Sequence, residues 1–142
     1  GEIGSGIYGK TIEVIQTDTQ DKYAKKLLTN VEGSINNDKL FSGCDSLSKS
    51  QYPFYLPPSY ITNANDDEQD SYAAIFTNYM TNKSLHYIIE QQISETPIDE
   101  YDSTQEYLIL YGISCFLESF HSNKKVHGSL KLTNVLFCAI QL

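Results

Sequence analysis

The segment Gly4-Ser5-Gly6-Ile7-Tyr8-Gly9-Lys10-Thr11, close to the start of the chain, decides the fold. It satisfies two phosphate-binding patterns at once, GxxxxGKT and GxGxxG. The first is the pattern of a P-loop, and the second occurs in dinucleotide-binding loops and in other glycine-rich nucleotide loops. A P-loop or a dinucleotide-binding loop leads directly into a helix, whose amino-terminal N–H groups hold the phosphates. The residues that follow the glycines therefore separate the alternatives.

Those residues predict a strand instead of a helix. Ile12-Glu13-Val14-Ile15 alternates in the manner of a β-strand, and β-branched and aromatic residues return between Tyr23 and Leu28. The polar break from Thr17 to Asp21 separates the two segments, so they predict two strands joined by a turn. A glycine turn between strands disfavours the P-loop alternative, which needs a helix directly after Thr11.

Further segments, in matching order and separation, make the chain resemble the protein kinase family. They are the glycine-rich segment, Tyr23-Ala24-Lys25-Lys26, the segment from Thr77 to Leu85, and the segment from His121 to Leu136. The resemblance covers essentially the whole chain. It implies an α+β fold with an antiparallel small lobe over residues 1–76, a hinge over 77–83 and the start of the helical lobe over 84–142. By this resemblance the kinase-like domain is incomplete, because the Asp-Phe-Gly metal-binding segment would follow Leu142.

The resemblance also implies an ATP site. In the family, the lysine of the A-x-K strand grips the α- and β-phosphates, a role that falls on Lys26. Thr77 matches the gatekeeper, and the main chain at Asn78 and Met80 would bind adenine. Lys25 is expected to face solvent, since adjacent strand residues point to opposite faces. The implied nucleotide-binding residues are Ile3, Gly4, Ser5, Gly6, Gly9, Thr11, Ala24, Lys26, Thr77, Asn78, Met80 and Leu136.

The catalytic loop departs from the family pattern H-R-D-L-K-x-x-N, which reads here His127-Gly128-Ser129-Leu130-Lys131-Leu132-Thr133-Asn134. Ser129 takes the place of the aspartate that accepts the substrate proton. Loss of such a general base typically costs about 100- to 10,000-fold in rate. Gly128 replaces the arginine that pairs with a phosphorylated activation loop in many members. Lys131 keeps the position that contacts the transferred phosphate, and Asn134 is the candidate magnesium ligand.

The acidic partner of Lys26 is also missing at its expected place. Residues 30–50 are polar, so any helix there is expected to be short and weakly determined. Matching Leu47 to Pro53 with the family puts Gly43 where the glutamate should stand. Other acids are Asp45, which is nearest in sequence, and then Asp38 and Glu32.

Two helices are expected in the second half of the chain. The first covers residues 84–92. The second begins with a capping box between Ser103 and Glu106 and continues to about Ser122. Because this helix is apolar nearly all round, we expect burial on most of its sides.

The composition argues against two classes of binding partner, nucleic acids and membranes. Among 142 residues there are 10 lysines, no arginine and 18 acidic residues, so the net charge is −8. Nucleic acid is not an expected partner, because such binding depends on basic side chains. The longest apolar stretch, Tyr107–Ile113, falls far short of the roughly 20 residues that cross a bilayer, so no membrane partner is expected. Three separated cysteines and no secretory signal predict a reducing, cytoplasmic location.

These observations predict a pseudokinase-like or remnant ATP-binding domain, with weak or absent magnesium dependence, that acts through conformation or a protein partner. The alternative is an active protein kinase of which this chain is a fragment, with Ser129 tolerated or compensated elsewhere. A P-loop nucleotide triphosphatase is the third hypothesis, and a strand directly after Thr11 would exclude it.

Overall fold

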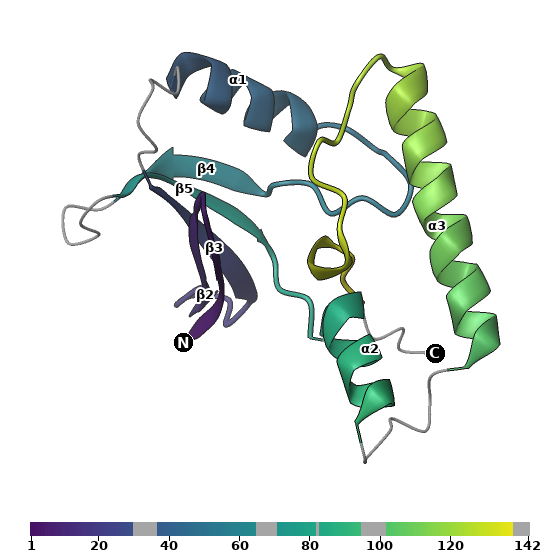
Figure 1. Cartoon of the computed structure of the whole chain (residues 1–142). Helices are drawn as coiled ribbons and strands as arrows, with labels where there is room; N and C mark the ends of the chain where they lie inside the picture. Colours follow the sequence, from purple (N-terminus) through teal and green to yellow (C-terminus); the bar gives the residue numbers. More distant parts are fainter. Residues whose placement is uncertain (30–36, 65–70, 82, 95–101, 138–142) are drawn as a thin grey trace. The chain divides into compact units, whose positions relative to one another are not determined.

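The computed structural model describes residues 1–29, 37–64, 71–81, 83–94 and 102–137 (Figure 1). The chain divides into two compact units. The first consists of Gly1–Ser50 and Leu56–Tyr79, and the second of Gln51–Tyr55 and Met80–Leu142. A short segment from the middle of the sequence thus belongs with the second half of the chain.

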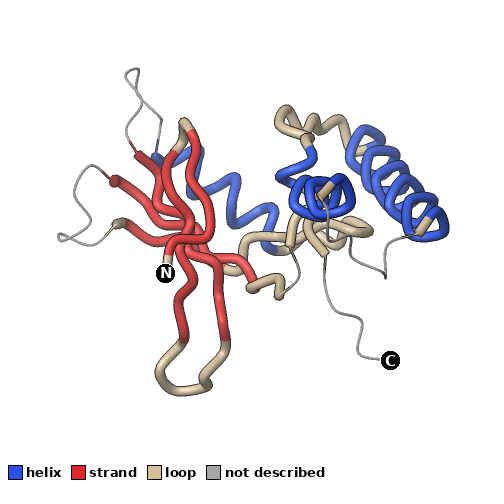
Figure 2. Tube along the Cα trace, turned by 60° about the horizontal axis from the view of Figure 1, so that its bottom comes forward, coloured by secondary structure: helices blue, strands red, loops and turns tan. Residues whose placement is uncertain are grey.

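The first unit contains a five-stranded antiparallel sheet in the order β1-β2-β3-β5-β4. Its strands are drawn in red in Figure 2. Its strands are β1 (Glu2–Gly6), β2 (Gly9–Ile15), β3 (Lys22–Thr29), β4 (Tyr60–Asn63) and β5 (Ser71–Asn78). The strands expected around residues 12–15 and 23–28 are therefore confirmed. Because β2 follows the glycine turn directly, the P-loop hypothesis is excluded.

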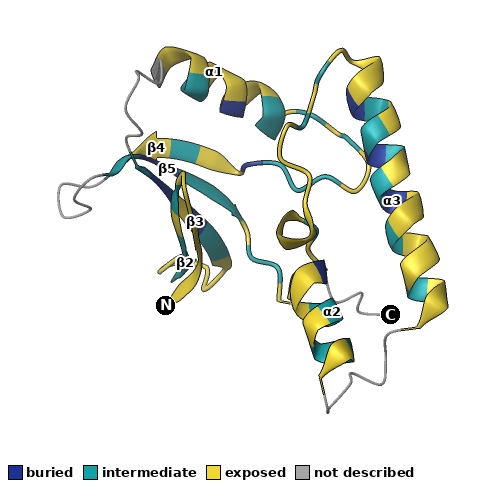
Figure 3. Cartoon of the chain, in the orientation of Figure 1, coloured by how far each residue is buried: buried dark blue, intermediate teal, exposed yellow. Residues whose placement is uncertain are grey.

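The most buried side chains of this unit lie on its two central strands. Leu27 on β3 and Ala73 and Ala74 on β5 are at most 2% exposed, whereas β1 is exposed along its whole length. Figure 3 colours buried residues dark blue and exposed residues yellow. This difference follows from strand order, because β3 and β5 have a neighbour on each side and β1 is an edge strand.

Helix α1 (Asn37–Ser48) packs near β4 within the first unit. It has 12 residues and is longer than the short helix expected in this polar region. Cys44 is its buried residue, at 8% exposure, and Leu40, Phe41 and Leu47 are half-buried beside it. The few apolar side chains of the segment recur at helical spacing, which is enough to give α1 one packed face.

The second unit contains α2 (Leu85–Ile93), α3 (Ser103–Ser122) and a short 3₁₀ helix, η1 (Leu132–Asn134). Both predicted helices are confirmed. The Ser84 hydroxyl caps α2 by accepting from the Tyr87 amide. No helix in the described ranges has the combination of length and apolar character needed to cross a membrane.

The predicted capping box of α3 is wrong by one residue. Asp102, and not Ser103, accepts hydrogen bonds from the amides of Thr104 and Gln105, at 2.9 and 3.1 Å. The Gln105 side chain accepts in return from the Asp102 amide, at 3.1 Å. A carboxylate is favoured over a hydroxyl at this point because it also meets the positive end of the helix dipole.

Burial of α3 is one-sided in the part of the chain that the structure describes, contrary to the expectation from its sequence. Gly112, Phe116 and Phe120 are buried. Tyr52 and Tyr55 pack against this side, with ring centroids 5.0 Å (Tyr52 to Phe120) and 5.5 Å (Tyr55 to Phe116) apart. The apolar side chains that remain more than 60% exposed are Tyr107, Leu108, Leu110 and Tyr111. Segment 51–55 joins the second unit through these ring contacts.

Candidate nucleotide-binding and catalytic-loop sites

The glycine turn joins β1 to β2, and its third glycine is required by the sheet itself. Gly9 has a φ of +127°, and a Cβ built there would lie 1.8 Å from the Leu27 carbonyl oxygen. Gly4 and Gly6 differ, because a Cβ at either position meets no atom within 4 Å. Folding therefore demands glycine only at position 9, and the space beside the other two is open. Ile3 and Ser5 lie on the same exposed strand β1.

Four of the residues implied to line the nucleotide site lie on one face of three adjoining strands. Thr11 on β2 pairs with Lys26 on β3, and Ala24 on β3 pairs with Thr77 on β5. Directly opposed residues of an antiparallel pair share a face, and so do residues two apart on one strand. Thr11, Ala24, Lys26 and Thr77 consequently form two neighbouring rows, and we call this surface the Lys26 face.

The opposite face of these strands holds Lys25, for which the sequence predicts exposure to solvent. Lys25 does not face solvent: it is 8% exposed, and its Nζ lies 5.7 Å from the centroid of the Phe76 ring. Phe76 pairs with Lys25 across β3 and β5, and the Tyr60 ring stacks on Phe76 at 4.2 Å. The two lysines do point to opposite faces as expected. Aromatic side chains cover Lys25, and Lys26 is the exposed one.

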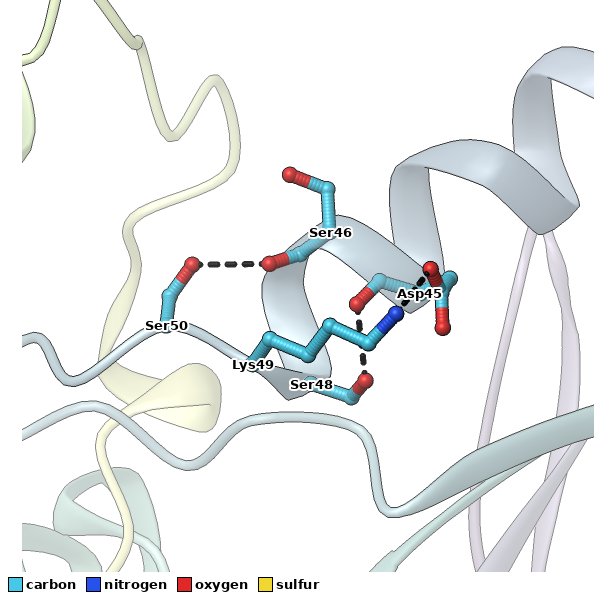
Figure 4. Close-up of polar contacts among 5 residues, drawn as sticks. All are labelled: Asp45, Ser46, Ser48, Lys49 and Ser50. Atoms are coloured by element: carbon cyan, nitrogen blue, oxygen red, sulfur yellow. Dashed lines mark hydrogen bonds and ion pairs between the residues drawn. The ribbon is translucent and has the colours of Figure 1, made fainter.

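Lys26 has no carboxylate within ion-pair distance among the described residues. Asp45, the acid nearest to Gly43, instead binds Lys49, the residue just past the end of α1, with Oδ2 and Nζ 2.7 Å apart (Figure 4). The hydroxyls of Ser48 and Ser50 donate to the carbonyls of Asp45 and Ser46 at the same helix end. Asp45 is thus engaged elsewhere. Asp38 is exposed on the first turn of α1, and Glu32 lies outside the described residues.

An ion pair that the sequence analysis missed borders the Lys26 face. Glu13 pairs with Ala24 across β2 and β3, and its carboxylate lies 2.7 Å from the Lys22 ammonium. This hydrogen-bonded contact lowers the pKa of Glu13 and raises that of Lys22. The Lys22 ammonium also lies 5.6 Å from the centroid of the Tyr79 ring. The sequence could have revealed this contact, because residues at equal distances from the turn at 16–21 face each other. That rule pairs Glu13 with Ala24 and puts Lys22 two residues away on the same face.

In the second unit, the catalytic loop is held by a short set of hydrogen bonds. The Asn134 amide donates to the Ser129 carbonyl at 2.7 Å and to the Ser129 hydroxyl at 3.3 Å. His127 accepts from the Ser129 amide through Nδ1 at 3.2 Å, and its ring meets Phe116 edge-on. Ser129, Lys131 and Asn134 are all exposed. The loop is therefore ordered although its aspartate is replaced.

The hydrogen bonds between Asn134 and Ser129 determine which atom of Asn134, the predicted metal ligand, is left for a cation. Because Asn134 uses its NH₂ group on Ser129, its Oδ1 has no donor among the described residues and remains available to a cation. Described histidines, cysteines and acids form no group of three or more that could hold a metal without help. Asn134 therefore offers one oxygen ligand of the kind that magnesium prefers.

Leu136 and Met80 also lie in the second unit. Leu136 forms an isolated antiparallel bridge with Ser84, and the Leu85 amide donates to the Val135 carbonyl at 2.8 Å. The start of α2 therefore anchors the segment that follows the catalytic loop. Leu136 is 48% exposed and Met80 is half-buried. Asn78, the other residue implied to bind adenine, ends β5 in the first unit.

Comparison with known proteins agrees with this fold. The chain superposes on the kinase domain of maize SIRK1, sucrose-induced receptor kinase 1, crystallised with AMP-PNP, with a TM-score of 0.78 and 22% sequence identity. The match covers 99% of this chain and 47% of that one, so the chain spans about half the length of this structural relative. A search of curated protein sequences finds no significant match. The sequence model of the protein kinase domain matches residues 1–141. The chain belongs to the protein kinase domain family.

Proposed function

We propose that the chain binds ATP through the Lys26 face and the glycine turn, and that its phosphoryl transfer is impaired. The observation that carries the proposal is the register that puts Thr11, Ala24, Lys26 and Thr77 on one face of β2, β3 and β5. Three small or β-branched side chains there, Thr11, Ala24 and Thr77, suit a planar base. The exposed ammonium of Lys26 suits a phosphate, which needs a positive charge. The bound AMP-PNP of the maize kinase domain supports the same ligand class.

Each part of the nucleotide has a candidate partner in the chain. The open space beside Gly4 and Gly6 lets main-chain N–H groups approach phosphate oxygens without a side chain between them. The remaining roles come from the resemblance to protein kinases, which implies that the main chain at Asn78 and Met80 would hydrogen-bond the adenine. It also implies Asn134 Oδ1 as a ligand of magnesium, which would neutralise phosphate charge when bound.

The impairment rests on Ser129 and on the lack of a carboxylate partner for Lys26 among the residues that the structure describes. A serine hydroxyl is not ionised near neutral pH, so Ser129 cannot accept the substrate proton as a carboxylate does. Gly43 offers no side chain to hold Lys26. We therefore assign the domain a role through nucleotide-dependent conformation or contact with a protein partner, in the cytoplasm.

ATP binding is tested by calorimetric and thermal-shift titration of the intact protein, with and without magnesium. We expect saturable binding that Lys26→Met weakens by at least about tenfold, since it removes the phosphate's cationic partner. Lys49→Met is the matched control, because it removes an exposed lysine of the same unit and should leave the affinity unchanged. No binding up to millimolar ATP would refute the proposal.

Impairment is tested separately by radiolabelled phosphate transfer to a mixture of protein acceptors. We expect transfer by the unmodified protein to be slower than by Ser129→Asp, by about 100-fold or more, the lower end of a general base's contribution. Brisk transfer by the unmodified protein that disappears in Lys26→Met would instead establish the active-kinase alternative.

A further inference from the structure

Three polar side chains meet where the first unit ends. Glu13 lies on β2, Lys22 begins β3, and Tyr79 immediately follows β5. Lys22 binds Tyr79 twice: its carbonyl accepts from the Tyr79 amide at 3.2 Å, and its ammonium lies over the Tyr79 ring. The same ammonium contacts the Glu13 carboxylate at 2.7 Å. Lys22 therefore ties β2 to the residue after β5.

This cluster is adjacent to the Lys26 face. Glu13, Ala24 and Thr77 lie in one row across β2, β3 and β5. Lys22 is two residues before Ala24 on the same strand and therefore projects from the same face. Tyr79 directly follows Asn78, whose main chain we propose to bind adenine. Any movement of Tyr79 away from β3 would displace that main chain.

The cluster has too little burial to act through global stability. The Lys22 side chain is 52% exposed and the Glu13 side chain 25% exposed. Exposed ion pairs contribute little to folding because water screens them and ordering the side chains costs entropy. A contact of this kind can nevertheless select one local conformation of a chain segment that leaves a sheet.

We propose that Glu13, Lys22 and Tyr79 form a clamp that positions the Asn78–Tyr79 main chain for adenine. The inference rests on the proposed ATP site for its functional part, whereas its structural part does not require ATP. Lys22 is a positioning residue here, since it acts on the nucleotide through Tyr79 and Asn78.

The structural part is tested by hydrogen exchange of the intact protein without ligand. In Lys22→Met we expect the amides of residues 77–81 to exchange about three- to tenfold faster, the range given by an exposed ion pair plus a cation–π contact. Lys22→Arg keeps both contacts and should restore slow exchange. Glu13→Gln removes the same ion pair by replacing the carboxylate, and it should also accelerate exchange of these amides.

Lys49→Met is the matched control, because the Asp45–Lys49 pair has the same 2.7 Å length and lies at the end of α1. It should leave residues 77–81 unchanged. Unchanged exchange in Lys22→Met, or an equal acceleration in Lys49→Met, would overturn the clamp.

The functional part is tested by ATP affinity of the same variants. We expect Lys22→Met to weaken binding by about three- to tenfold and Lys22→Arg to retain it. If the unmodified protein binds ATP, and Lys22→Met exchanges faster yet binds equally well, the positioning role is overturned while the ATP site stands. If the unmodified protein does not bind ATP, the proposed function and the positioning role both fail, and hydrogen exchange alone decides the clamp.

Discussion

The Asn134 side-chain amide binds Ser129 at two points, the main-chain carbonyl at 2.7 Å and the hydroxyl at 3.3 Å. The shorter bond goes to the main chain, which any residue at position 129 provides. The catalytic loop therefore owes its shape to Asn134 more than to the identity of the side chain at 129. The main-chain bond from Asn134 thus does not depend on which side chain stands at position 129.

Asn134→Ala should consequently loosen the loop more than Ser129→Ala. The first variant removes both hydrogen bonds, whose net value is about 1 kcal/mol each, whereas the second removes only the longer one. We expect amide exchange across residues 128–134 to accelerate by about tenfold in Asn134→Ala and by a few-fold at most in Ser129→Ala. Equal acceleration in the two variants would show that the hydroxyl is the main anchor.

Gly9 and Gly6 offer a matched pair within one hairpin. Gly9→Ala puts a Cβ against the Leu27 carbonyl at a φ that L-residues rarely adopt, and should destabilise the protein by about 2 to 4 kcal/mol. Gly6→Ala meets open space and should change the free energy of unfolding by less than about 1 kcal/mol. Chemical denaturation of both variants measures the difference. Equal losses would mean that the hairpin demands glycine at both positions.

The strands and the two later helices could be predicted from the sequence because their signals are local. Alternating residues at 12–15 predict β2, the apolar residues between Tyr23 and Leu28 predict β3, and the register of the hairpin then follows from its turn. The shift of the α3 cap from Ser103 to Asp102 is a single-residue error. Such errors arise because adjacent capping residues compete and tertiary context decides between them.

The burial of Lys25 could not be predicted in the same way. Whether Lys25 or Lys26 is covered depends on Phe76 and Tyr60, which come from strands more than 30 residues away in sequence. Periodicity separates the two faces of a strand but does not say which face receives aromatic partners. The candidate site was accordingly predicted by motif, whereas the clamp on Tyr79 became visible only with the strand register.

Gly43 and Gly112 provide a second matched pair, on helices of different units. A Cβ at Gly43 meets no atom within 4 Å, so Gly43→Ala should stabilise α1 by about 0.5 to 1 kcal/mol through helix propensity alone. A Cβ at Gly112 would lie 3.2 Å from the Phe54 ring, so this ring must shift by a few tenths of an ångström to admit it. Gly112→Ala should therefore stabilise the protein less than Gly43→Ala does, because the displaced ring offsets part of the gain in helix propensity.

Urea unfolding of the two variants checks this pair. Stabilisation by Gly112→Ala as large as that by Gly43→Ala would show that the Phe54 ring moves freely. Destabilisation by Gly43→Ala would show that a side chain at this position meets an obstacle, and Gly43→Glu would then be unsuitable for restoring a carboxylate partner to Lys26.

Cys44 should respond to pH in a direction set by its burial. Burial on α1 raises the pKa of its thiol, because the thiolate loses hydration there. The folded protein should therefore hold Cys44 protonated while the unfolded chain ionises near its ordinary pKa of about 8.5. Proton release then favours the unfolded state, so stability falls as the pH rises above this value.

Alkylation with iodoacetamide, mapped by mass spectrometry, should be at least about tenfold slower at Cys44 in the native protein than in urea, since the thiolate is the nucleophile. Half-buried Cys115 gives an internal comparison, and native Cys44 reacting as fast as in urea would contradict a packed inner face of α1.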